Sequence, residues 1–108
     1  MQPSGAVHAY YDRYWRDGFW ANNPYERWKL ERVKAIASTF RPGARALDVG
    51  CGDARILAEL APLRFRSLGL DTSDSAVEQA RTRGIEVRRA DIDGARLPAS
   101  DGEFDLVL

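Results

Sequence analysis

The chain has 108 residues, with 16 lysines and arginines against 16 aspartates and glutamates, so its formal net charge is zero. This balance excludes a polycationic arm, and the 44% hydrophobic content argues against intrinsic disorder. The single cysteine, Cys51, has no partner for an intrachain disulfide, and a metal site built from several cysteines is excluded.

The N-terminal region is rich in aromatic residues. Eight of them lie between positions 10 and 28: Tyr10, Tyr11, Tyr14, Trp15, Phe19, Trp20, Tyr25 and Trp28. In the first half they recur three and four residues apart, which places them on one face of a helix. We expect this stretch to be a flap that packs on the main core, or else to contact a ligand directly.

A helix is predicted from position 24 to about Ser38. Pro24 suits a first helical position after Asn23 as cap, with Glu26 as the returning acid of a capping box. Its apolar residues follow a three-to-four spacing: Leu30, Val33, Ala37 and Phe40. We expect residues 1–42 to form the aromatic-rich flap and first helix, and residues 43–108 to form a ligand-binding domain.

From Gly43 onward, short apolar runs alternate with helical periods. Strands are predicted at 44–49, 67–70, 85–90 and 104–108, with helices after the first and second of them. This alternation predicts the α/β class with a Rossmann-like, doubly wound parallel sheet. Because the sequence stops inside the fourth apolar run, we expect a domain truncated after the fourth strand, with an unprotected edge.

Residues 46–55 read ALDVGCGDAR, a strand that leads through glycines into a helix. Gly50 and Gly52 lack a Cβ, so the backbone can turn tightly and approach a ligand. Dinucleotides and adenosyl amino acids both bind such loops. The dinucleotide fingerprint would need a glycine at Arg55, and Asp48 would stand close to the pyrophosphate. A NAD-type oxidoreductase fragment is therefore the alternative rather than the first interpretation.

The segment ALDVGCGDA resembles motif I of the class I S-adenosylmethionine-dependent methyltransferases. Three further segments are similar to the later motifs of that family, in the same order: LGLDTS at 68–73, RADI at 89–92, and LP at 97–98 followed by FDLV at 104–107. The resemblance covers about residues 44–108. It implies an adenosyl cofactor, and it is nearest to the methyltransferases that act on small molecules.

The resemblance also implies roles for individual residues. Gly50, Cys51 and Gly52 would bring backbone against the methionine part of the cofactor, and Asp48 would supply negative charge for its ammonium group. The ribose and adenine would be met at the ends of the next two strands. The predicted cofactor-binding residues are Asp48, Gly50, Cys51, Gly52, Asp71, Thr72, Asp91 and Ile92. Simpler interpretations are that Asp71 caps the following helix and that Asp91 is a turn residue.

The predicted function is methyl transfer from S-adenosylmethionine to a small-molecule acceptor. No catalytic base can be identified, no metal site is predicted, and the chain alone is expected to bind cofactor weakly and turn over little. Ala54 stands where motif I carries a third glycine, which leaves a non-catalytic interaction module as another alternative.

The sequence also carries expectations about location and partners. Residues 1–8 contain no secretory signal, and no apolar run approaches the ~20 residues of a membrane helix, so a cytoplasmic protein is expected. The densest basic cluster, Arg81, Arg83, Arg88 and Arg89, is interrupted by acids, and no nucleic-acid partner is expected.

Overall fold

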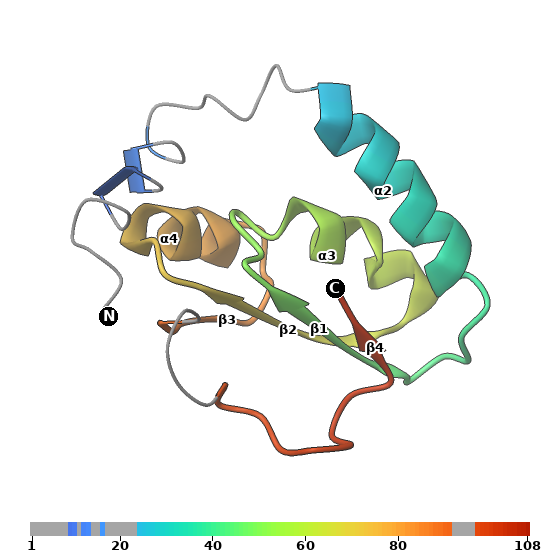
Figure 1. The fold of residues 1–108 in the computed structure, drawn as a ribbon. Helices are drawn as coiled ribbons and strands as arrows, with labels where there is room; N and C mark the ends of the chain where they lie inside the picture. The colour runs from blue at the N-terminus through green and yellow to red at the C-terminus, as the bar shows by residue number, and fades with distance from the viewer. Residues whose placement is uncertain (1–8, 11, 14–15, 17–23, 92–96) are drawn as a thin grey trace.

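The computed structural model of the chain describes residues 9–10, 12–13, 16, 24–91 and 97–108. Its elements follow the chain in this order: α2 (Pro24–Ala37), β1 (Arg45–Val49), α3 (Arg55–Glu59), the 3-10 helix η2 (Ala61–Leu63), β2 (Arg66–Asp71), α4 (Asp74–Thr82), β3 (Val87–Arg89) and β4 (Leu106–Val107). Figure 1 shows the arrangement.

The four strands form one parallel sheet in the order β3-β2-β1-β4. Within it, Leu47 of β1 pairs with Leu68 of β2 on one side and with Val107 of β4 on the other. The α/β class and the Rossmann-like parallel sheet predicted from the sequence are thus confirmed. Because β2 and β3 extend to one side of β1 and β4 to the other, the carboxyl end of β1 is a switch point where such sheets bind ligands.

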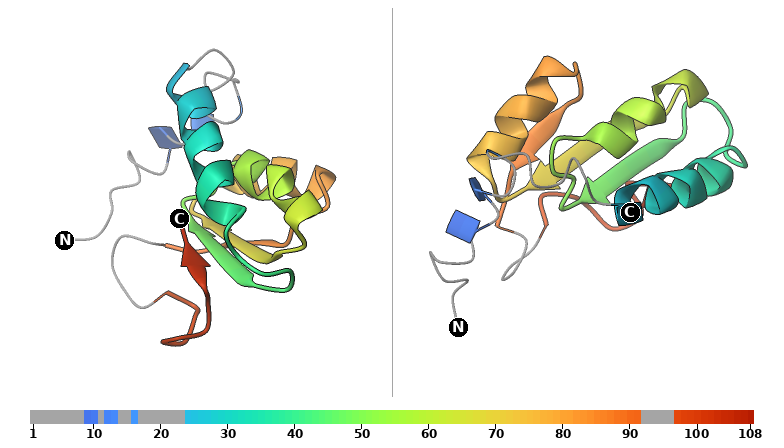
Figure 2. Two further views of the ribbon diagram at one scale, coloured as in Figure 1. Left: turned by 90° about the vertical axis from the view of Figure 1, so that its right-hand side faces the viewer. Right: turned by 90° about the horizontal axis from the view of Figure 1, so that it is seen from above.

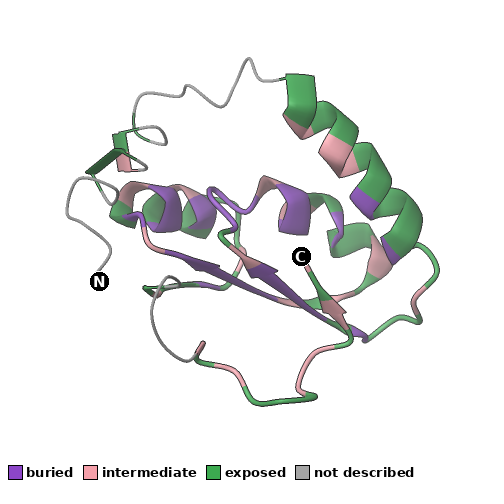
Figure 3. Cartoon of the chain, viewed as in Figure 1, coloured by how far each residue is buried: buried purple, intermediate pink, exposed green. Residues whose placement is uncertain are grey.

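The two faces of the sheet are covered differently. Figures 1 and 2 show α2, α3 and α4 on one face, while the chain that leads into β4 passes under the other. Ala46 faces the helices and joins the core that contains Leu57 and Leu60, whereas Leu47 faces the opposite side, with Leu70. Figure 3 shows the buried residues concentrated in the strands and the inner sides of the helices. Both faces of β1 therefore carry apolar side chains, as its continuous apolar run predicted.

Helix α2 has the face that the sequence predicted. Val33 and Ala37 are buried, while Leu30 and Phe40 are half-buried. The helix ends at Ala37, close to the predicted Ser38. The proposed cap, Asn23, lies outside the described residues. Within the part of the chain that the structure describes, no helix has the length and apolar character required to cross a membrane.

The last two strands are shorter than predicted. The prediction placed strands at 85–90 and 104–108, whereas β3 spans Val87–Arg89 and β4 spans Leu106–Val107. At β4 the reason is Asp105, whose carboxylate accepts the Arg45 N–H at 2.8 Å while its own N–H donates to the Arg45 carbonyl at 2.9 Å. These two hydrogen bonds precede the regular pairing of β1 with β4, which starts only at Leu106.

Candidate functional site

A tight loop follows β1 at the switch point of the sheet. Gly50 and Gly52 have φ angles of 74° and 59°, in the left-handed region that glycine adopts without steric cost. Ala54, which precedes α3, is also left-handed, with φ of 63°. The backbone conformation at Ala54 is therefore one that a third glycine would adopt readily, and alanine adopts it at a cost.

Most N–H groups of this loop donate hydrogen bonds within the protein. The Leu70 carbonyl accepts from Gly50 at 2.8 Å and from Cys51 at 2.9 Å. Ala54 donates to the Cys51 carbonyl at 3.1 Å, and Arg55 donates to the Asp53 carboxylate at 3.2 Å. A pyrophosphate bound at this loop would need such donors free, so the geometry argues against the dinucleotide alternative.

Asp71 ends β2 beside the loop and is buried. Its Oδ2 accepts the Gly52 N–H at 2.8 Å, and its Oδ1 accepts the Ser73 N–H at 2.8 Å. Because each carboxylate oxygen accepts two hydrogen bonds, one acceptor site remains on each. The side chain that caps α4 is Ser73, whose Oγ accepts the Ala76 N–H at 3.1 Å, so the interpretation of Asp71 as the helix cap is wrong.

Asp48 is a buried acid near the end of β1. Only 3% of its surface is exposed, and no hydrogen bond or ion pair reaches its carboxylate from the described residues. Burial raises the pKa of Asp48 to about 6, while the charge of Lys29 on α2 acts in the opposite direction. A buried carboxylate without a partner is costly, and a cation placed beside it would remove much of that cost.

A small cavity of about 40 Å³ lies at this point. Its lining residues come from α2, β1, the glycine loop and the start of α3: Glu26, Lys29, Asp48, Gly50, Cys51, Asp53, Arg55 and Ile56. The cavity is therefore lined by groups of both charges, with a basic group from α2 and an acid from β1 among them.

Asp91 follows β3 at the same edge of the sheet, and its side chain is exposed. The Thr72 hydroxyl donates to Asp91 Oδ1 at 3.4 Å, and Arg89 Nη2 lies 3.6 Å from the same oxygen. Thr72 and Asp91 therefore lie together beyond the ends of β2 and β3. Ile92, the remaining predicted site residue, lies outside the described residues.

Cys51 is buried inside the loop rather than presented to solvent. Burial raises the pKa of its thiol, which disfavours the nucleophilic thiolate. A Cβ added to Gly69 on β2 would lie 2.6 Å from the Cys51 sulfur, so the missing side chain at Gly69 is what makes room for Cys51. The thiol is therefore a packing group, and the contact of the loop backbone with a cofactor stays a prediction.

Several residues at this edge were not identified from the sequence. Buried Asp53 forms an ion pair with Arg83 at the end of α4, with Asp53 Oδ2 at 3.0 Å from Arg83 Nη2. Asp12, from the N-terminal region, accepts hydrogen bonds at the start of α4. Lys29 could have been noticed in the sequence, because it lies four residues before Val33 and therefore on the same side of α2. No comparable signal pointed to Arg83 or Asp12, whose contacts are long-range.

The basic cluster noted in the sequence is largely compensated by acids. Arg83 pairs with Asp53, Arg88 lies 2.9 Å from Glu86, and Arg89 lies 3.2 Å from Asp74. These guanidinium groups therefore do not form one uncompensated basic surface.

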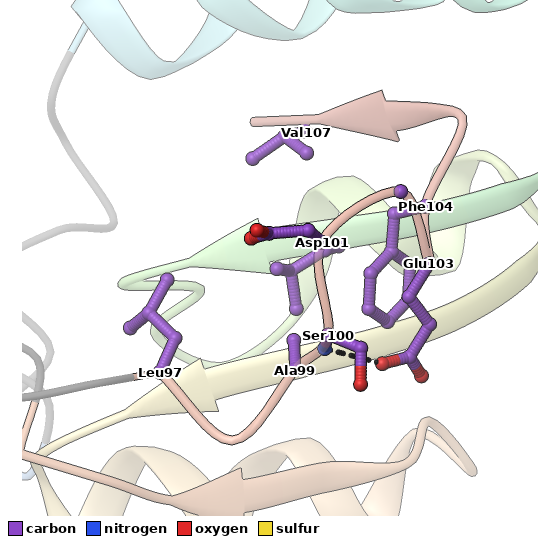
Figure 4. Close-up of a pocket in the computed structure, with 9 residues that line it drawn as sticks. Leu97, Ala99, Ser100, Asp101, Glu103, Phe104 and Val107 are labelled. Carbon is purple, nitrogen blue, oxygen red and sulfur yellow. Dashed lines mark hydrogen bonds between the residues drawn. The ribbon is translucent and has the colours of Figure 1, made fainter.

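A larger cavity of about 700 Å³ lies on the opposite face of the sheet, between Leu47 and the chain that leads into β4. Figure 4 shows Leu97, Phe104 and Val107 around it, with the Ser100 N–H donating to Glu103 at 2.8 Å. Of the predicted cofactor-binding residues that the structure describes, none lines this cavity. Its walls combine apolar side chains with Ser100, Asp101 and Glu103, whereas Asp48 lines the cavity at the glycine loop.

Comparison with known proteins agrees with this geometry. The family model described as methionine biosynthesis protein MetW matches residues 31–108. The chain belongs to the MetW family. Class I S-adenosylmethionine-dependent methyltransferases share this fold, and the chain covers the cofactor-binding portion, which confirms the family resemblance found in the sequence.

Individual relatives of this MetW-family chain are methyltransferases. It is 35% identical over 77 residues to a putative methyltransferase of Geobacillus, a match that covers 68% of this chain and 31% of that protein. It is 26% identical to a methyltransferase of Thiobacillus denitrificans solved with S-adenosyl-L-homocysteine, with a TM-score of 0.60 over 79% of this chain and 35% of that one.

A third relative supports the fold alone. The putative methyltransferase of Haloferax volcanii, solved in complex with the Trm112 methyltransferase activator, is 24% identical, with a TM-score of 0.73 over 90% of this chain and 45% of that one. The MetW-family chain thus spans less than half the length of these relatives. Its family and fold are those of S-adenosylmethionine-dependent methyltransferases, and the comparisons do not identify a methyl acceptor.

Proposed function

We propose that this chain binds S-adenosylmethionine at the carboxyl ends of β1, β2 and β3 and presents its methyl group to a small-molecule acceptor. The observation that carries the proposal is the position of Asp71. Its carboxylate is fixed to the loop through Gly52, is buried, and keeps an acceptor site on each oxygen. A ribose offers two adjacent hydroxyl donors, which such a carboxylate can accept side by side.

The methionine part of the cofactor suits the cavity at Asp48. Its ammonium group would neutralise the buried Asp48 carboxylate, and Lys29, which also lines the cavity, would attract its carboxylate. The positive φ angles of Gly50 and Gly52 turn the backbone between these groups and Asp71. The residues present therefore match the charges at both ends of an amino acid.

The adenine would lie beyond β3. Thr72 and Asp91 already lie together there, and Asp91 offers an exposed carboxylate oxygen to the exocyclic amine. Ile92 would contact the ring, as the family resemblance implies. With Asp71 on the ribose, these assignments place the cofactor along one edge of the sheet, at the ends of β1, β2 and β3.

When bound, the cofactor supplies a methyl group on a sulfonium, which needs no further activation as a leaving group. The chain's own residues would hold the donor in a fixed orientation for in-line attack, and orientation can contribute several kcal/mol to the rate. In this proposal residues 43–108 hold most of the cofactor, Lys29 of α2 adds a charge at its methionine end, and the aromatic-rich flap within residues 1–42 contributes to the acceptor side. The position of Asp12 at the start of α4 supports that division, since it brings the N-terminal region beside the cofactor site.

The test is calorimetric titration of the chain with S-adenosyl-L-homocysteine and, separately, with NAD⁺. We expect one molecule of S-adenosyl-L-homocysteine to bind per chain and NAD⁺ to give no heat of binding. Binding of NAD⁺ without binding of S-adenosyl-L-homocysteine would contradict the proposal and favour the dinucleotide alternative.

A further inference from the structure

Asp12 connects the N-terminal region to the start of α4. Its Oδ1 accepts the Ser73 hydroxyl at 2.9 Å and the Ser75 N–H at 2.9 Å, across 61 and 63 residues of sequence. Figure 1 shows the described N-terminal residues, in blue, beside this end of α4. The first N–H groups of a helix have no acceptor within the helix, so Asp12 supplies one that α4 lacks. The bond from the Ser75 N–H is also what lowers the pKa of the Asp12 carboxyl most, since it favours the charged form.

Ser73 continues the connection toward the candidate site. Its side chain donates to Asp12, while its backbone N–H donates to Asp71 Oδ1 at 2.8 Å. The other oxygen of Asp71 accepts the Gly52 N–H at 2.8 Å. An unbroken series of hydrogen bonds therefore joins Asp12, Ser73, Asp71 and Gly52.

Ser73 can connect Asp12 to Asp71 because its side chain is buried and held in place. Its exposed fraction is 0%, and its Oγ also accepts the Ala76 N–H at 3.1 Å. Loss of the Asp12 acceptor would leave the Ser73 hydroxyl and the Ser75 N–H without their bonds. The start of α4 would then rearrange to recover them, and the Ser73 N–H that holds Asp71 would move with it.

We propose that Asp12 is a positioning residue for the cofactor site, which fixes the start of α4 so that Asp71 stays bonded to Gly52 and directed at the ribose. This inference rests on the proposed function. It has a thermodynamic corollary: if docking of Asp12 favours cofactor binding, cofactor binding favours docking of Asp12 by the same factor. Asp12 then responds to the cofactor through Ser73 and Asp71.

The first test compares Asp12→Ala with the wild-type chain by calorimetry with S-adenosyl-L-homocysteine. We expect affinity to fall about 5- to 10-fold, the lower range of coupling between sites. Asp12→Asn retains an amide oxygen for Ser73 and Ser75, so its affinity should stay within about threefold of wild type. The matched control is Glu78→Gln, which removes an exposed acid of α4 and should leave the affinity for S-adenosyl-L-homocysteine unchanged. Wild-type affinity in Asp12→Ala would overturn the inference while leaving the proposed function intact.

The second test needs no variant and therefore holds if Asp12→Ala fails to fold. Arg13 is exposed and adjacent to Asp12, so trypsin cleavage after Arg13 reports release of this region. We expect S-adenosyl-L-homocysteine to slow this cleavage several-fold, with half of the effect at the calorimetric dissociation constant. Cleavage that does not change when the wild-type chain is saturated would overturn the inference. A wild-type chain that binds no S-adenosyl-L-homocysteine would contradict the proposed function and this inference together.

Discussion

The Asp71 carboxylate accepts the Gly52 N–H at 2.8 Å, so the acid at the end of β2 and the loop after β1 form one unit. The second oxygen of Asp71 accepts the Ser73 N–H at 2.8 Å. Only a carboxylate has an acceptor for both donors, because an amide offers one oxygen and one NH₂ group. The identity of residue 71 is therefore set by the protein's own backbone before a ligand is considered.

Asp71→Asn should lower the affinity for S-adenosyl-L-homocysteine by about 10-fold or more. The Asn NH₂ group would face either the Gly52 or the Ser73 N–H, and a hydrogen bond to a charged acceptor contributes about 1.5–3 kcal/mol. The measurement is calorimetry at a temperature where circular dichroism shows the variant folded. Asp101→Asn, an exposed acid beside the cavity on the opposite face, is the control and should bind as wild type does. Unchanged affinity in Asp71→Asn would rule out the ribose assignment.

Asp48 should make folding stability and cofactor affinity depend on pH in opposite directions. Burial raises its pKa to about 6, above the ordinary value of 3.8, so the folded chain binds more protons than the unfolded chain between these values. Stability therefore falls as pH rises through this window, by on the order of 2–3 kcal/mol. Affinity for a ligand ammonium should instead rise, since it requires the ionised Asp48.

The check is Asp48→Asn, which has no charge to desolvate. Urea unfolding at pH 4 and pH 8 should show that the variant loses less stability than wild type on going to pH 8. Calorimetry with S-adenosyl-L-homocysteine should show that its affinity no longer increases between pH 5 and pH 8. An identical pH dependence of affinity in both chains would place the ammonium group elsewhere.

Ala54→Gly should change the free energy of unfolding by less than about 1 kcal/mol. The left-handed conformation costs alanine roughly 1–2 kcal/mol, which glycine would remove. Against this, glycine loses a buried methyl group worth about 0.8 kcal/mol and adds about 0.4–1 kcal/mol of freedom to the unfolded chain. Because Ala54 is fully buried, the loss of its methyl group does cost stability, and this loss offsets the relief of backbone strain.

Ala54→Val provides the contrast at the same position. A β-branched side chain is strained at φ of 63°, and its two additional methyl groups would have to fit into a fully buried site. We expect a loss of about 2 kcal/mol or more in urea unfolding. A valine variant as stable as wild type would show that the loop does not hold this conformation.

Arg83→Met should destabilise the chain by about 1–2 kcal/mol while keeping most of the side-chain volume. It leaves the buried Asp53 carboxylate without its 3.0 Å partner. Removing one member of a fully buried pair costs about 3–5 kcal/mol, and we reduce this because Arg83 is itself 40% exposed. Arg81→Met, an exposed arginine on the same helix, is the control. Equal thermal midpoints for the two variants would mean that the pair does not stabilise the loop.

The order and class of the elements could be predicted because each signal is local. The apolar run at 44–49 and the glycines after it are sufficient to place β1 and its loop, and β1 begins one residue later than predicted. The ends of the strands could not be predicted, because they depend on which residues of neighbouring strands pair. The exchange between Asp105 and Arg45 that delays β4 joins residues 60 positions apart.

The same distinction applies to the candidate site. Asp48, Asp71 and Asp91 could be named as candidate cofactor-binding residues because they stand at or near the ends of successive strands. Their supporting groups come from elsewhere in the chain. Asp12 lies 61 residues from Ser73, and Arg83 lies 30 residues from Asp53. No spacing rule reaches across such distances, so the positioning contacts emerge only once the chain is folded.

The most direct test of the cofactor site is a titration of the ¹⁵N-labelled chain with S-adenosyl-L-homocysteine, followed by amide chemical shifts. The amides of Gly52 and Ser73, which both donate to Asp71, should shift with increasing ligand, while those of Ser100 to Phe104 on the opposite face should stay in place. Shifts confined to residues 100–104, or no shifts at saturating ligand, would contradict the account.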